Sequence, residues 1–287
     1  MTYLHLLLPA ALLKVTAGKS REQGMRHRFG VSDWIRAAVV AAVLLLALCL
    51  RGLADDAGIH IPGLPMSSFG GSSMDNLLAV IFVVLALLVL RRRDGPASAG
   101  YLLGLGASGW RGPVLVLLCT VPFWISSALT GTVSTDLDVR ALIFQSLLFP
   151  FAEELVFRGF GFVFPVTGLR WRPWAAALVQ AFCFGGIHWL SQHENGSDQA
   201  TTIFVMTFLG GIVFAALDGL DRYTLWSGLA FHVSLNAAWN VFDDAPAAAG
   251  WGWISNALRL VCAALAVGTL WWLRRRRHVL RTSAQRT

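Results

Sequence analysis

Three charged side chains interrupt a long apolar run of this chain. Glu153, Glu154 and Arg158 lie within Ala141–Val166, which otherwise consists mainly of Leu, Phe, Val, Ala, Gly and Pro. A charge inside an apolar run of membrane length costs a few kcal/mol on insertion scales, so such residues tend to face a protein interior and to carry function. These three residues therefore predict a buried polar site that contains carboxylates.

Two other apolar runs carry polar side chains that could complete this site. His188 follows Phe184 by four residues, and Asn236 follows His232 by four. Side chains four residues apart share one face of a helix. Three separate helices are therefore expected to present polar groups to one internal cavity.

Helical geometry divides the charged motif into two parts. Glu154 and Arg158 are four residues apart and are expected to form an ion pair that supports the helix. Glu153 is rotated by about 100° from its neighbour, so it points elsewhere. A carboxylate that is partly withdrawn from water is a competent base near neutral pH. We therefore assign Glu153 as the base and the pair as its support.

The composition predicts a membrane protein. Of 287 residues, 56% are hydrophobic and 14% are charged, whereas soluble domains are about 25% charged. Several apolar runs approach the roughly 20 residues that a spanning helix needs. We expect an all-α polytopic transmembrane helix bundle of about eight spans. The expected spans are 34–53, 76–90, 113–129, 141–166, 173–190, 201–217, 225–242 and 251–273.

The basic residues predict the orientation of the bundle. Lys and Arg number 23 against 16 Asp and Glu, and they cluster at alternate ends of the apolar runs, as at Arg91–Arg93 and Arg274–Arg277. Under the positive-inside rule this pattern puts both termini in the cytoplasm. It also explains the net charge without a nucleic-acid partner. The four cysteines lie inside apolar runs and form no Cys-x-x-Cys pair, so neither a disulfide framework nor a thiolate metal site is indicated.

The expected spans divide the chain into four segments. Residues 1–33 form a cytoplasmic N-terminal segment, either an interfacial helix or sequence upstream of a true start at Met25. Residues 34–130 hold the first three spans, and 139–242 form the catalytic core. Residues 251–287 hold the last span and a basic tail.

The three motifs together resemble those of a known family. Glu-Glu-x-x-x-Arg is present at Glu153–Arg158, Phe-x-x-x-His at Phe184–His188, and His-x-x-x-Asn at His232–Asn236. This order is similar to that of the CPBP intramembrane metalloproteases, which include type II CAAX prenyl endopeptidases and bacterial Abi proteins. The resemblance implies an integral protein of the bacterial cytoplasmic membrane that acts on a membrane-anchored or hydrophobic peptide.

Peptide hydrolysis assigns a task to each polar residue. Glu153 would activate a water molecule that His188 shares, and His232 and Asn236 would donate hydrogen bonds to the oxyanion. We expect the cleavage to occur near the cytoplasmic face.

The role of a metal stays open at this point. The chain has no His-Glu-x-x-His motif, so it is not a zincin. Glu153, His188 and His232 could form a His₂Glu set for zinc with a fourth position for water. The same residues also suffice for a metal-free glutamate mechanism.

Two other classes of function compete with a protease. One is a non-catalytic membrane protein on the same scaffold, such as an immunity factor or a maturation partner. The other is a proton-coupled transporter, which the lack of an internal repeat disfavours.

Overall fold

The computed structural model describes residues 31–65, 69–91, 97–135, 137–191, 196–243 and 252–284. The chain divides into two units, Met1–Ile35 and Arg36–Thr287. Most of the predicted segment 1–33, including Met25, lies outside the described residues, as do Arg92, Arg93 and Trp251.

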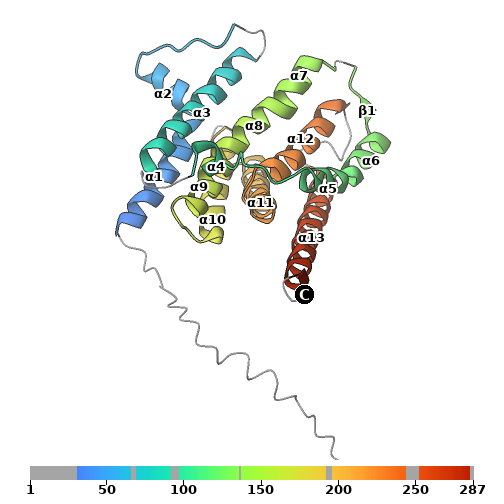
Figure 1. Cartoon of the computed structure of the whole chain (residues 1–287). Helices are drawn as coiled ribbons and strands as arrows, with labels where there is room; N and C mark the ends of the chain where they lie inside the picture. The colour runs from blue at the N-terminus through green and yellow to red at the C-terminus, as the bar shows by residue number, and fades with distance from the viewer. Residues whose placement is uncertain are drawn as a thin grey trace, which may run out of the picture. The chain divides into compact units, whose positions relative to one another are not determined.

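The described part of the chain is built almost entirely from helices (Figure 1). Its two short strands, β1 and β2, pair antiparallel with Thr132 opposite Asp243. The all-α class predicted from the sequence is therefore confirmed. In chain order the elements are α1 (Val31–Ala47), α2 (Leu50–Asp56), α3 (Gly70–Leu90), α4 (Ala99–Leu102), α5 (Arg111–Cys119), α6 (Val121–Thr130), β1 (Thr132–Val133), α7 (Val139–Ile143), η2 (Phe144–Leu148), α8 (Phe149–Glu153), η3 (Glu154–Val163), α9 (Phe164–Thr167), α10 (Pro173–Leu190), α11 (Asp198–Leu220), α12 (Trp226–Val241), β2 (Phe242–Asp243) and α13 (Trp253–Ala284).

Long apolar helices identify an integral membrane protein. Within the described residues, four helical stretches are long and apolar enough to cross a membrane: Gly70–Leu90, Arg111–Thr130, Asp198–Leu220 and Trp253–Arg276. Their outer faces carry exposed aliphatic side chains; Val89, for example, is 83% exposed. A bent pair, α1 with α2, would make a fifth span, so the expected count of about eight and the position of the termini are not confirmed.

Two expected spans are interrupted, the first by a sharp bend and the third by a change of helical segment within one continuous stretch. The first turns by 76° between α1 and α2. Just after this turn, Arg51 pairs with Asp75 at 2.7 Å, which compensates the carboxylate inside α3. This helix starts at Gly70 rather than at Asn76 as expected. The third span breaks at the residue before α6, whose second residue is a proline that lacks a backbone N–H.

The helix that carries the charged motif runs from Val139 to Thr167 and widens twice along the way. The π-helical stretches η2 and η3 come just before Pro150 and Pro165. A proline ring clashes with the carbonyl group four residues earlier, here that of Ser146 or Gly161. A wider turn accommodates the ring, and π-helical turns are frequent at functional sites.

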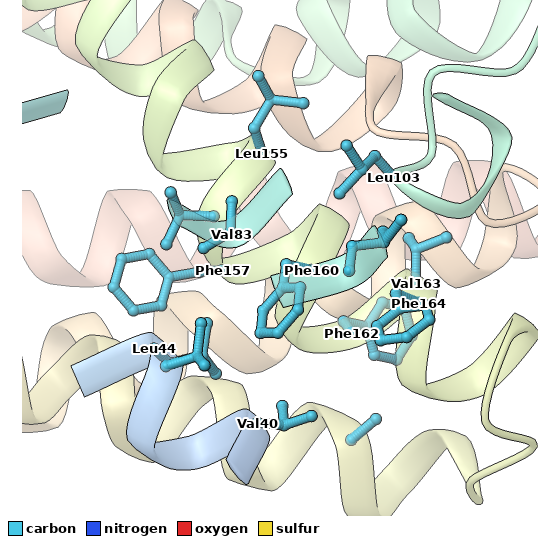
Figure 2. Close-up of a cluster of buried hydrophobic side chains, with 14 of the residues drawn as sticks. Val40, Leu44, Val83, Leu103, Leu155, Phe157, Phe160, Phe162, Val163 and Phe164 are labelled. Carbon is cyan, nitrogen blue, oxygen red and sulfur yellow. The ribbon is translucent and has the colours of Figure 1, made fainter. Parts of the chain in front are cut away.

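The motif helix occupies the centre of the bundle. Every residue of η3 is buried, and its aromatic side chains pack with aliphatic residues of α1 and α3 (Figure 2). Gly161 is needed for this packing, because a Cβ there would lie 2.9 Å from the Cβ of Gln180 and 3.0 Å from Leu44. A second apolar cluster joins α5, α6, α11, α12 and α13.

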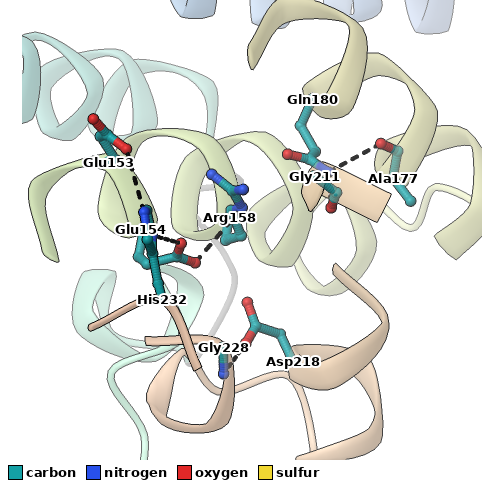
Figure 3. Close-up of polar contacts among 9 residues, drawn as sticks. All are labelled: Glu153, Glu154, Arg158, Ala177, Gln180, Gly211, Asp218, Gly228 and His232. Atoms are coloured by element: carbon teal, nitrogen blue, oxygen red, sulfur yellow. Dashed lines mark hydrogen bonds and ion pairs between the residues drawn. The ribbon is translucent and has the colours of Figure 1, made fainter. Parts of the chain in front are cut away.

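α10 and α11 form a close pair beside the motif helix. α10 has the predicted bounds, Pro173–Leu190. A Cβ on Gly211 would lie 2.9 Å from Ala181, so the two helices approach closely at a small residue, as membrane helices commonly do. Gln180 Nε2 donates to the carbonyl oxygen of Gly211 at 2.7 Å and pins the contact (Figure 3).

Candidate active site

A single cavity brings together the four side chains to which the sequence assigns catalytic tasks. Glu153 from α8, His188 from α10, and His232 and Asn236 from α12 all line it. Its volume is about 390 Å³, within the range of roughly 300–1,000 Å³ that is typical of ligand sites. α10 and α12 enter the bundle at different heights, and their histidines nevertheless face the same space.

His232 links the two glutamates of the motif (Figure 3). Its Nδ1 lies 2.9 Å from Glu154 Oε1, and its Nε2 lies 3.8 Å from Glu153 Oε2. A carboxylate only accepts hydrogen bonds, so Nδ1 donates to Glu154 and Nε2 is turned toward Glu153. Two atoms 3.8 Å apart can share one water molecule at about 2.8 Å from each.

Glu154 and Arg158 form the expected ion pair in the interior of the bundle. Arg158 Nε lies 3.6 Å from Glu154 Oε2, and both side chains are 0% exposed. The guanidinium lies between the rings of Phe184 and Phe214, at 4.2 and 4.4 Å. Phe214 also stacks on His232 at 4.9 Å. Aromatic faces and a carboxylate thus compensate a cation that is removed from water.

His188 is oriented by its own helix. Its Nδ1 donates to the carbonyl oxygen of Phe184 at 2.8 Å, which leaves Nε2 as the acceptor. The two rings pack edge to face at 4.4 Å. Phe184 therefore links His188 to Arg158, because its ring contacts both side chains.

Asn236 and Asn240 tie α12 to the π-helical stretch η2. Asn236 Nδ2 donates to the carbonyl oxygen of Gln145 at 3.3 Å, and Asn240 Nδ2 donates to Ser146 Oγ at 3.2 Å. An amide nitrogen carries two hydrogens. Asn236 therefore keeps one donor for another partner in the cavity.

Two aspartates that the sequence placed in a loop hold the start of α12. Asp218 is 0% exposed, and its Oδ1 accepts from the backbone N–H of Gly228 at 3.2 Å (Figure 3). The signal available in the sequence was an acidic residue at the end of an apolar run.

Asp221 makes the second anchor. Its Oδ2 accepts from the hydroxyl groups of Ser108 and Ser227 at 2.9 and 2.7 Å, and from Thr224 at 3.3 Å. Burial raises the pKa of this carboxyl group above its usual range, although these hydrogen bonds oppose the rise. The two aspartates fix the helix that carries His232.

Arg259 is a further cavity residue that sequence reasoning missed. It comes from α13 and lies near the rings of Phe123 and Trp239, at 5.6 and 5.3 Å. It is a single charge inside the last apolar run, which was the available signal.

The predicted zinc ligands do not assemble. Within the described ranges, no group of three His, Cys, Asp or Glu side chains lies close enough to hold a metal ion. This holds for Glu153, His188 and His232, although all three line the cavity. The three side chains as placed therefore do not fit the predicted His₂Glu site.

Comparison with known families finds a match over part of the chain. Residues 135–238 match the model of a family described as type II CAAX prenyl endopeptidase Rce1-like. This segment is an Rce1-like domain. It contains Glu153, His188, His232 and Asn236, and it excludes α13 with Arg259. No curated protein and no solved structure matches the chain significantly.

The family sets the broad class of activity. Rce1-like domains are found in CAAX-type intramembrane endopeptidases, so the chain carries a protease domain. Together with the apolar helices, this match describes an integral membrane protein that carries an Rce1-like domain.

Proposed function

We propose that this protein is an intramembrane endopeptidase that hydrolyses a peptide bond of a membrane-associated polypeptide. The observation that supports the proposal is the convergence of Glu153, His188, His232 and Asn236 on one cavity. The cavity lies among helices that present apolar faces, which suits a hydrophobic peptide or a prenylated one.

The reaction begins with Glu153 and a water molecule. Glu153 removes a proton from the water, and the resulting hydroxide oxygen attacks the carbonyl carbon of the peptide bond. The free Nε2 of His188 accepts the second hydrogen of this water and fixes its direction. The side chain of Glu153 is 24% exposed, so water reaches it without opening the core.

The oxyanion that forms needs donors. His232 Nε2, when protonated, and the remaining amide hydrogen of Asn236 supply them from one face of α12. Glu154 accepts from His232 Nδ1 and stabilises the positive charge on the ring, as an acidic residue behind a catalytic histidine does.

Collapse of the intermediate completes the cycle. The carbon–nitrogen bond breaks, and the proton held by Glu153 passes to the departing amine nitrogen. One product then carries a new carboxylate and the other a new amine. Every atom comes from the peptide and one water molecule.

A fluorogenic peptide that ends in Cys-aliphatic-aliphatic-X, with and without a farnesyl group on its cysteine, tests the proposal. Purified protein in lipid nanodiscs should cleave at least one of the two peptides, and Glu153→Gln should reduce kcat by about 10²–10⁴-fold. Asp243→Asn removes an exposed carboxylate and serves as the matched control with unchanged activity. Equal rates for Glu153→Gln and the parent protein would refute the assignment.

A further inference from the structure

The loops that join the helices meet in two groups, and hydrogen bonds show which of them lie together. Trp226 Nε1 donates to the carbonyl oxygen of Gly106 at 2.7 Å, and Arg274 Nη1 donates to that of Gly219 at 3.1 Å. The ring of Tyr223 packs at 5.9 Å from that of Phe162, just before the turn that leads to α10. We call this group the basic end; it comprises residues 104–110, 168–172, 219–226 and 274–276.

The opposite group lies where α10 and α12 finish. There Thr132 pairs with Asp243, and Ser134 N–H donates to the carbonyl oxygen of Val241 at 2.9 Å. We call this group the acidic end; it comprises residues 130–135, 137–138, 190–191, 196–198 and 241–243.

The two ends differ in charge in the way that fixes membrane orientation. The basic end carries six arginines: Arg170, Arg172, Arg222, Arg274, Arg275 and Arg276. The acidic end carries three aspartates and none of these arginines: Asp138, Asp198 and Asp243. Arginine and lysine are enriched in loops that stay in the cytoplasm. The basic end is therefore the cytoplasmic one.

The cavity lies toward the acidic end. α10 contributes His188 and the residue after its last turn, Ser191, whereas its first half contributes nothing. α13, which starts beside the acidic end, contributes Arg259, Leu260 and Ala263 from its first third. Leu260 is 48% exposed and forms part of the rim.

Buried charged side chains lie beyond the cavity residues, toward the basic end. Glu154, Arg158 and Asp218, each 0% exposed, separate the cavity from the basic end. Below them, Asp221 holds the 219–226 turn against Ser108. A peptide arriving from the basic end would have to displace this buried charge cluster, which is costly because each separated charge would remain away from water.

We infer that substrate enters the cavity from the non-cytoplasmic side of the membrane. The inference rests on the proposed endopeptidase function and names its substrate class: a polypeptide segment exposed at the non-cytoplasmic surface or held in that half of the bilayer. It replaces the expectation, drawn from the sequence, of cleavage near the cytoplasmic face.

Cysteine accessibility tests the inference without any need for activity. The four native cysteines are free, so replacing Cys49, Cys119, Cys183 and Cys262 by alanine gives the background. Three single reporters are then added: Ser191→Cys at the cavity rim, Val133→Cys at the surface of the acidic end, and Ala107→Cys at the surface of the basic end. All three positions are exposed.

Intact cells that express each reporter are treated with a membrane-impermeant maleimide. Ser191→Cys and Val133→Cys should react at least tenfold faster than Ala107→Cys, and Ala107→Cys should react fully once the membrane is permeabilised. Labelling of Ala107→Cys alone would overturn the inference. It would also fail if Val133→Cys reacted but Ser191→Cys reacted only after permeabilisation.

The same reporters separate this inference from the proposed function. Labelling as expected, with no cleavage of any peptide by the parent protein, would contradict the endopeptidase and leave the orientation standing. Cleavage that depends on Glu153, with a cavity labelled only from the cytoplasm, would leave the endopeptidase standing and contradict the direction of entry.

Discussion

Replacing Glu154 by glutamine tests the buried charge cluster directly. Glu154 is 0% exposed, accepts from His232 at 2.9 Å and pairs with Arg158 at 3.6 Å. Breaking a buried ion pair by removing one partner costs about 3–5 kcal/mol. The rings of Phe184 and Phe214 still contact the Arg158 guanidinium, so we expect a loss at the lower end of this range, about 3 kcal/mol. A domain of roughly 150–250 residues loses about 2–4 °C in Tm per kcal/mol, which gives a fall of about 6–12 °C.

The same substitution should slow catalysis to an intermediate degree. The hydrogen bond from His232 to a charged acceptor is worth about 1.5–3 kcal/mol. If this energy is available only when the histidine is doubly protonated, its loss reduces kcat by roughly 10–150-fold. Glu153→Gln should behave differently: kcat falls further, while Tm changes by less than about 2 °C because Glu153 makes no buried ion pair comparable with that of Glu154.

Thermal unfolding in detergent and kcat for the fluorogenic peptide are measured for both variants. The reasoning is refuted if Glu154→Gln keeps the parent Tm, or if the two variants lose the same amount of stability. A kcat for Glu154→Gln within twofold of the parent value would remove Glu154 from the account of the oxyanion site.

Three further outcomes are expected. Gly228→Ala should lower Tm and kcat, since its Cβ would lie 2.5 Å from Asp218 Oδ1. Gly268→Ala, whose Cβ would meet no atom within 4 Å, should lower neither, and equal effects of the two variants in thermal unfolding would contradict this. The pKa of Asp221 is raised in the folded state, so the folded protein binds this proton more tightly than the unfolded chain. Its contribution to stability should therefore fall as pH rises above 3.8, and Asp221→Asn should remove that slope from the pH profile of unfolding; a persistent slope would count against it. Peptide cleavage should survive treatment with a chelator, and elemental analysis should find less than one metal ion per chain, because the His₂Glu ligands are not grouped closely enough in the described residues. Loss of cleavage on chelation that is restored by zinc would contradict this prediction.

The helical class and the residues of the cavity were accessible from the sequence. Charges and imidazoles inside apolar runs are costly, so Glu153, His188 and His232 stand out without any structure. Spacing of four residues also predicted the ion pair of Glu154 with Arg158, because that distance is set by the helix itself.

Local patterns gave less information about the ends and breaks of helices. Hydropathy treats a run as one span, yet the turn between α1 and α2 and the break before α6 depend on single residues and on partners far along the chain. The sequence predicts Asp75 to lie in a loop, whereas in the structure it lies in α3 and pairs with Arg51.

Only the tertiary structure decided which groups face one another across helices. Neither the spacing nor the composition indicates that His232 bridges Glu153 and Glu154, that Asp218 holds the start of α12, or that Arg259 reaches the cavity from outside the Rce1-like domain. The physical reason is range: helical periodicity fixes the face on which a residue lies within one helix, whereas packing between helices decides what that face meets.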